Sequence, residues 1–125
     1  MKLIGIDHIV LCVSDVNRTI AFYEGVLGMK ALEERPGKWS LHFGANKISL
    51  QDAASAPDIA RDTVPGSGNF CVLTEEPVQR LAETLEYQGF DVVAGPDERK
   101  GATGTLLSVY IRDPDGNLVE ISNRL

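Results

Sequence analysis

Residues Tyr110–Ile121 read YIRDPDGNLVEI, with alternating apolar and polar residues on either side of Asp-Pro-Asp-Gly-Asn. Proline, glycine, Asp and Asn are the residues that tight turns favour, and an alternation with a period of two is typical of a strand with one buried face. The stretch therefore predicts two strands, Leu106–Arg112 and Leu118–Asn123, joined by the tight turn Asp113–Asn117.

The residues before this stretch complete one half of the chain. Asn69–Thr74 is an apolar run typical of a strand, and Val78–Gln88 has helical spacing that ends at Gly89. A short strand at Asp91–Ala94 and a loop at Gly95–Gly104 follow. The predicted order is strand, helix, strand, strand, strand.

The first half of the chain repeats this order. We expect a helix at Asp15–Leu27, capped by Ser14 or Asp15, and strands at Ile6–Val13, Met29–Glu33, Lys38–Phe43 and Lys47–Gln51. The distance from His8 to Gly28 equals that from Asn69 to Gly89, so the halves superpose with an offset of 61 residues. The last strands, which end at Gln51 and Glu120, are offset by 69 residues, and we place the extra residues in the Gly95–Gly104 loop.

The two halves predict one domain over residues 1–125, with a first module at 1–52 and a second at 69–125. Residues 53–68 are rich in Ala, Pro, Asp, Ser and Gly without a period, so we interpret them as a linker.

Successive strand residues point to opposite faces of a sheet. One face is apolar throughout and suits the two helices, whereas the other mixes apolar residues with His, Gln, Asn, Ser and Tyr. This second face is either a solvent-exposed surface or, as its mixture favours, the lining of a concave site.

Several stretches resemble the vicinal oxygen chelate superfamily, which holds glyoxalases, fosfomycin- and bleomycin-resistance proteins and extradiol dioxygenases. They are Asp7–Leu11, Thr19–Tyr23, Leu27–Met29, Phe43-Gly44 and Tyr110–Ile121, with Pro65–Ser67 and Arg99–Ala102 closest to short glyoxalase-domain proteins. The resemblance covers essentially the whole chain. It implies an α+β fold in which two tandem βαβββ modules form a half-open mixed-sheet barrel.

The resemblance also implies a divalent metal, held by residues of the first and fourth strands of each module. Carried over, these are His8 and Gln51 from the first half and Asn69 and Glu120 from the second. Asn69 departs from the pattern, since relatives usually have His there. One imidazole, one carboxylate and amide oxygens suit octahedral Mn²⁺, Mg²⁺, Ni²⁺, Co²⁺ or Fe²⁺ better than a thiolate zinc site, although Zn²⁺ is retained. The set binds metal weakly, so a chain without metal is the alternative.

Glu120 is the expected catalytic residue, which moves a proton between adjacent carbons as the glyoxalase glutamate does. Candidate substrate-binding residues are Tyr110 and Ser108, on the face of Glu120, then Arg99 and Lys100, which could hold an anionic group, and finally Trp39 and His42. Each has a plain structural alternative: barrel filling for Tyr110, solvation for the basic pair and packing for Trp39.

The composition of the chain limits the kinds of molecule that it is expected to bind. The chain has 12 basic and 18 acidic residues, a net charge of −6, and no basic run longer than Arg99-Lys100, so we expect no nucleic acid. No membrane-spanning run and no signal layout is present, and Cys12 and Cys71 fit buried reduced thiols, which predicts a cytoplasmic protein. The resemblance further implies a homodimer.

The sequence thus favours a glyoxalase-type, metal-dependent lyase or isomerase of the lactoylglutathione lyase kind, acting on a small oxygen-chelating substrate such as a 2-oxoaldehyde thiol adduct. One alternative is a bleomycin-resistance-type protein that sequesters a ligand without catalysis, for which the acidic charge suits a cationic drug. The other is an extradiol dioxygenase, which Asn69 disfavours.

Overall fold

The computed structural model describes residues 1–55 and 60–125. They form two compact units, Met1–Gly66 and Ser67–Leu125, each with one helix and one four-stranded mixed sheet. The linker expected at 53–68 lies in part outside the described residues, and the boundary between the units falls within it. The expected α+β fold with two βαβββ modules is confirmed.

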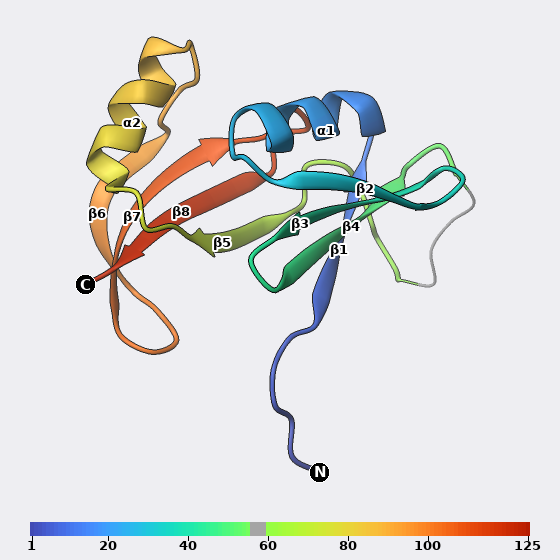
Figure 1. The fold of residues 1–125 in the computed structure, drawn as a ribbon, viewed down its shortest axis with the longest axis horizontal. Coiled ribbons are helices and arrows are strands. Elements are labelled where there is room, and N and C mark those ends of the chain that lie inside the picture. The colour runs from blue at the N-terminus through green and yellow to red at the C-terminus, as the bar shows by residue number, and fades with distance from the viewer. Residues whose placement is uncertain (56–59) are drawn as a thin grey trace. The chain divides into compact units, whose positions relative to one another are not determined.

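Unit 1 places its first strand beside its last (Figure 1). The strand order is β1-β4-β3-β2, with β1 and β4 parallel and the other pairs antiparallel. Its elements are β1 (His8–Val13), α1 (Val16–Gly25), β2 (Lys30–Arg35), β3 (Lys38–Phe43) and β4 (Asn46–Asp52).

Unit 2 has the same topology, with the order β5-β8-β7-β6 and a parallel β5–β8 pair. Its elements are β5 (Asn69–Leu73), α2 (Val78–Tyr87), β6 (Ala94–Lys100), β7 (Thr105–Arg112) and β8 (Leu118–Arg124). The predicted helices and most predicted strands are therefore confirmed to within a few residues.

The sixth strand differs from its predicted position. We expected a strand at Asp91–Ala94 and a loop at Gly95–Gly104, but the strand is Ala94–Lys100. This segment has little alternation of its own and becomes a strand because β7 supplies a hydrogen-bonding partner, as in the pairing of Glu98 with Leu107. An edge strand of charged residues is a common way to block pairing with other chains.

Gly95 gives β6 its bulge. Its φ is +88°, and a Cβ at this position would collide with the backbone carbonyl oxygen of Ser108 on β7. Only glycine lets the two backbones approach this closely.

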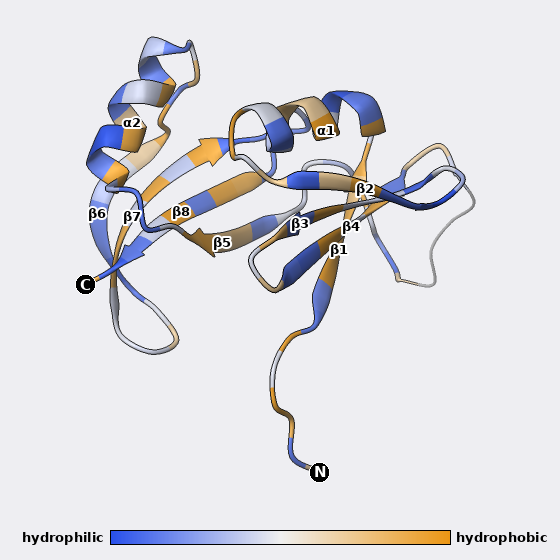
Figure 2. Ribbon diagram, viewed as in Figure 1, coloured by the Kyte–Doolittle hydropathy of each residue, from blue (hydrophilic) through white to orange (hydrophobic). Residues whose placement is uncertain are grey.

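Each helix packs against the sheet of its own unit, on the face that carries the buried apolar residues, so the expected division of faces is confirmed. Hydrophobic and hydrophilic residues follow one another along the strands (Figure 2). In unit 2, α2 contributes Val78, Ala82 and Leu85 to the core, opposite Val109 and Ile121 of the sheet, all buried. The expected cap of the first helix is Asp15, whose side chain accepts the N–H of Arg18 at 3.0 Å.

The Asp113–Asn117 turn is held by its own side chains. Asp113 Oδ1 accepts the N–H groups of Asp115 and Asn117, and Asp113 Oδ2 accepts from Asn117 Nδ2 at 2.8 Å. Asn117 Oδ1 in turn accepts the N–H of Gly68 at 2.6 Å. The sequence motif therefore fixes both the β7–β8 hairpin and the approach to β5.

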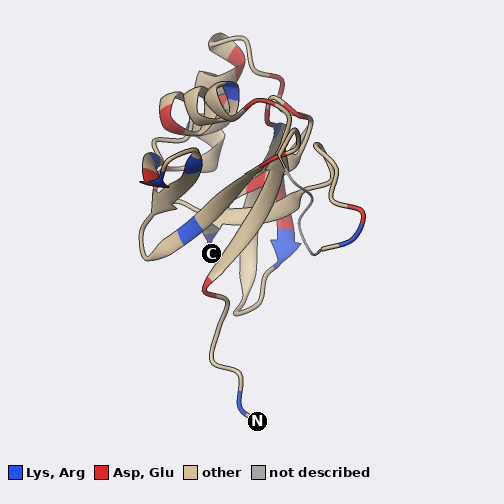
Figure 3. Ribbon diagram, turned by 90° about the vertical axis from the view of Figure 1, so that its right-hand side faces the viewer, with Lys and Arg blue, Asp and Glu red and all other residues tan. Residues whose placement is uncertain are grey.

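Lys and Arg residues are scattered along the ribbon among Asp and Glu residues (Figure 3). Among the described residues, no helix is long and apolar enough to cross a membrane. The two cysteines form no disulfide, but the expectation that they are buried is wrong, because Cys12 is half-buried and Cys71 is exposed. Both lie on the mixed face of a sheet, which the helices do not cover.

Candidate functional site

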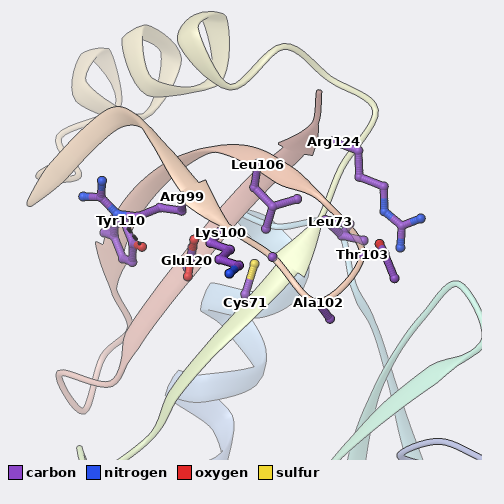
Figure 4. A pocket seen from close by; sticks show the side chains of 11 residues that line it. Cys71, Leu73, Arg99, Lys100, Ala102, Thr103, Leu106, Tyr110, Glu120 and Arg124 are labelled. Carbon is purple, nitrogen blue, oxygen red and sulfur yellow. Dashed lines mark hydrogen bonds between the residues drawn. The ribbon is translucent and has the colours of Figure 1, made fainter.

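Unit 2 carries a pocket of about 480 Å³ on the mixed face of its sheet (Figure 4). Strands β5, β7 and β8 supply Cys71, Leu106, Tyr110, Glu120 and Arg124 to its wall, while Arg99 and Lys100 enter from the end of β6. The loop that joins β6 to β7 completes the lining. The pocket is therefore built from one unit and one sheet face.

Strand register places the polar residues of this pocket in a row. Tyr110 pairs with Glu120 across β7 and β8, and Glu120 pairs with Cys71 across β8 and β5. Paired residues point to the same face of a sheet. The predicted grouping of Tyr110 with Glu120 is thus what the strand register shows, and Cys71 joins them.

Arg99 lies against Tyr110 at one end of the pocket. Its Nε donates to the phenol oxygen at 3.2 Å, and its guanidinium carbon lies 5.6 Å from the ring centroid. Burial raises the pKa of Tyr110, and the hydrogen bond to Glu120 together with the charge of that carboxylate adds to this effect, so the phenol stays protonated through the neutral range. The hydrogen bond from Arg99 opposes the shift.

Glu120 is half-buried, and its Oε1 accepts from Ser122 Oγ at 3.4 Å. Ser122 Oγ lies 2.7 Å from Ser108 Oγ and 3.3 Å from Cys71 Sγ. Ser108 was a candidate for substrate contact, but its exposed fraction is 0%. It therefore contacts Ser122 instead of a molecule in the pocket.

Basic side chains outnumber acidic ones around the pocket. Lys100 and Arg124 form no ion pair among residues 1–55 and 60–125, and Arg99 has only a 3.4 Å contact with Asp97. Glu120 is the single carboxylate in the lining. A chain of net charge −6 thus has a locally cationic pocket, which suits a ligand with an anionic group.

The two ligand positions expected in unit 2 share this face. Asn69 pairs with Leu118, so Glu120 lies two residues further along the neighbouring strand. An amide oxygen and a carboxylate oxygen are both donors that hard divalent cations accept. In the part of the chain that the structure describes, no group of three or more His, Cys, Asp or Glu residues is close enough to hold a metal.

Unit 1 contains the other two expected ligands, His8 and Gln51. His8 Nδ1 lies 2.7 Å from the Asp7 carboxylate, and this hydrogen bond lowers the pKa of Asp7. Because an ionised carboxylate only accepts, Nδ1 carries the proton of this hydrogen bond, and in the neutral imidazole Nε2 then keeps its lone pair. A histidine oriented by a carboxylate in this way is the usual arrangement of a metal-binding imidazole.

Gln51 is placed less favourably. Its Oε1 accepts from Lys38 Nζ at 2.9 Å, and it pairs with Cys12, four residues beyond His8 on β1. In unit 2, Glu120 pairs with Cys71, which lies only two residues beyond Asn69 on β5. By register, Ser49 is the counterpart of Glu120, so the offset between the last strands is 71 residues and not the expected 69.

The remaining candidates, Trp39 and His42, lie on β3 in unit 1. His42 Nε2 is 2.8 Å from the buried hydroxyl of Ser40, which also donates to Glu34. Trp39 lines a separate hollow with Glu34 and Ser49. Neither residue lines the unit 2 pocket.

Sequence reasoning missed Cys71, Ser122 and Arg124. Each follows the alternation of its strand onto the face of Glu120. The alternation predicts the sheet face of these residues, but a serine or cysteine in a strand does not by itself indicate a functional role. Their roles depend on register, which only the paired strands define.

A family model and the similar proteins of known sequence point to the same family. A family model described as the Glyoxalase/Bleomycin resistance protein/Dioxygenase superfamily matches residues 5–121. Virulence protein STM3117 of Salmonella typhimurium is 48% identical over 119 residues, which cover 94% of this chain and 82% of that protein. The glyoxalase domain-containing protein RDO1 of Mycosarcoma maydis is 38% identical over 120 residues, which cover 95% of this chain and 68% of that one.

Solved structures agree. The crystal structure of STM3117 matches with a TM-score of 0.93 at 44% identity, over 100% of both chains. A lactoylglutathione lyase from Agrobacterium tumefaciens matches with a TM-score of 0.71 at 28% identity, over 95% of this chain and 92% of that one.

Proposed function

The chain belongs to the Glyoxalase/Bleomycin resistance protein/Dioxygenase superfamily, and from this premise we propose that it is a glyoxalase-type, metal-dependent lyase or isomerase. Its substrate is a small molecule with neighbouring oxygen atoms and an anionic group. The observation that carries the proposal is Glu120, a half-buried carboxylate in a pocket whose other lining residues are basic, neutral polar or apolar.

The donor chemistry fits a hard divalent metal. In unit 2, Glu120 and Asn69 offer oxygen atoms on one sheet face, and in unit 1 His8 keeps a free Nε2 lone pair behind its hydrogen bond to Asp7. When bound, such an ion supplies a Lewis acid that polarises substrate oxygens. Gln51, already bonded to Lys38, is the weakest of the four expected ligands.

Glu120 is the group proposed to move the proton. A carboxylate in the pocket wall can take a proton from a carbon next to a carbonyl and return it to the neighbouring carbon. Tyr110, directly opposite on β7, stays protonated and can donate a hydrogen bond to the substrate oxygen on which negative charge develops. Arg99 keeps the phenol in place.

The basic side chains determine the kind of substrate. Lys100 and Arg124 line the pocket without an ion pair among the described residues, so they are available to a carboxylate or another anionic group. This arrangement favours an acidic thiol adduct. It weakens the charge argument for a protein that sequesters a cationic drug, because the pocket itself is cationic.

The test is a substrate screen with defined variants. Purified protein is supplied with Mn²⁺, Ni²⁺, Co²⁺ or Zn²⁺ and offered 2-oxoaldehydes with several thiols, catechols and epoxide antibiotics. We expect turnover of one oxoaldehyde adduct, at least about 100-fold reduced in Glu120→Gln. Turnover of a catechol, or tight binding of a drug without turnover, would overturn the proposal in favour of a dioxygenase or a sequestering protein.

A further inference from the structure

A pair of buried hydroxyls lies behind Glu120 in unit 2. Ser122 and Ser108 are both 0% exposed, and they pair with each other in the β7–β8 register. Their Oγ atoms are 2.7 Å apart, and Ser122 Oγ reaches Glu120 Oε1 at 3.4 Å. Neither hydroxyl lines the pocket, although both connect to a residue that does.

The number of available protons decides which group donates and which accepts in this series of hydrogen bonds. An ionised carboxylate can only accept, so the one hydroxyl proton of Ser122 points to Glu120. Ser108 must then donate its own proton to Ser122. The Cys71 thiol lies 3.3 Å from Ser122 Oγ and 3.8 Å from the Val72 carbonyl oxygen, and its single S–H serves these two acceptors. The order is Ser108 to Ser122 to Glu120, and aligned hydrogen bonds of this kind reinforce one another.

We infer that Ser122 and Ser108 are positioning residues that hold one carboxylate oxygen of Glu120 and leave the other to face the pocket. The inference rests on the proposed function, which makes Glu120 a ligand and proton carrier. It adds that Glu120 acts through a single oxygen, Oε2, because Oε1 is turned towards the buried pair. A hydroxyl that is itself buried and bonded has little freedom to release its partner.

The chain offers a matched control for a purely structural role. Ser40 in unit 1 is also 0% exposed and also donates to a glutamate, Glu34, at 3.0 Å. Its partner lies on the other sheet and does not line the unit 2 pocket. If the effect comes only from losing a buried serine hydroxyl, Ser40→Ala and Ser122→Ala should weaken metal binding alike. If it comes from losing the positioning of Glu120, only Ser122→Ala should weaken it.

The experiment measures Mn²⁺ affinity by electron paramagnetic resonance, with the metal alone as the probe. We expect Ser122→Ala to weaken binding about tenfold, Ser108→Ala to weaken it less, and Ser122→Thr, which keeps the hydroxyl, to retain it within about twofold. The double variant Ser108→Ala/Ser122→Ala leaves no stranded buried hydroxyl and should match Ser122→Ala. Equal losses in Ser122→Ala and Ser122→Thr, or an equal loss in Ser40→Ala, would overturn the inference.

Crystal structures of the parent and of Ser122→Ala supply a second readout that needs neither metal nor activity. The inference requires that the Glu120 carboxylate rotates or becomes disordered in the variant, and an unmoved carboxylate overturns it. If the parent binds no Mn²⁺, the metal part of the proposed function fails, and the carboxylate position in these structures still decides between positioning and packing.

Discussion

Arg99 covers the ring of Tyr110 and donates to its phenol oxygen at 3.2 Å. A nearby cation favours the phenolate, so this contact holds the pKa of Tyr110 below the level that burial and Glu120 would otherwise set. In Arg99→Met we therefore expect Tyr110 to ionise at higher pH, measured as the ultraviolet difference between each protein and its Tyr110→Phe counterpart. Lys100→Met, which removes a cation without touching the phenol, is the control. Equal shifts in both variants would contradict the assignment.

The proposed metal ligands should differ in how much each contributes to Mn²⁺ affinity. We expect Glu120→Ala to weaken Mn²⁺ binding by more than about 100-fold and His8→Ala to weaken it strongly, since each removes one of the direct ligands proposed above. Gln51→Ala should change the affinity less than about threefold, because its amide oxygen is held by Lys38. Titration calorimetry gives the three constants. If Gln51→Ala weakened Mn²⁺ binding as much as Glu120→Ala, Gln51 would be as important a ligand as Glu120.

Cys71 should be a slow nucleophile although it is exposed. Burial of the sulfur raises the pKa of its thiol, and the charge of Glu120 raises it further, so the thiolate fraction at neutral pH is small. We expect iodoacetamide to modify Cys71 appreciably only above the usual cysteine range, and faster in Glu120→Gln than in the parent. Mass spectrometry of the Cys71 peptide across pH 7 to about 10 measures the rate. A rate at pH 7 equal to that in urea would refute this.

The β7–β8 turn should dominate the stability of unit 2. Asn117 is 0% exposed and bonds to both Asp113 and Gly68, so Asn117→Ala removes the hydrogen bonds that its amide makes to the buried Asp113 carboxylate and to the backbone N–H of Gly68. We expect the free energy of unfolding to fall by about 2–4 kcal/mol in urea titrations. Glu83→Ala, on the exposed face of α2, should stay within about 0.5 kcal/mol of the parent.

Gly95 gives an independent test of the sixth strand. Gly95→Ala places a methyl group against the Ser108 carbonyl at a φ of +88° and should cost more than about 3 kcal/mol of unfolding free energy. Gly5→Ala, where a Cβ meets nothing within 4 Å, is the matched substitution. If both variants melt at the parent temperature, the close approach of β6 and β7 is wrong.

Much of the fold could be predicted because alternation and turn residues are local signals. Strand β3 was predicted to the residue, and the Asp113–Asn117 turn was recognised from its composition alone. Strand β6 was not, since Gly95, Pro96 and four charged residues become a strand only through pairing with β7.

The candidate site shows the same division. Glu120 was found through the family resemblance, and Tyr110 was found because the alternation along its strand puts it on the face of Glu120. Ser49 and Ser122 were not, because their importance comes from the partner that the register gives them. The family resemblance pointed to Gln51 on the fourth strand, whereas the strand register makes Ser49 the counterpart of Glu120.

The parallel pairing of first and last strands also bears on how each unit folds. Asn69 pairs with Leu118 and His8 pairs with Lys47, so each sheet closes by joining residues that are far apart in the sequence of its unit. Such closures are entropically slow, whereas the hairpins β2–β3 and β6–β7 join near neighbours in the chain and can form early. The row that joins Tyr110 and Glu120 to Cys71 is therefore completed late, when β5 docks on β8, and refolding kinetics of unit 2 should report the assembly of its pocket.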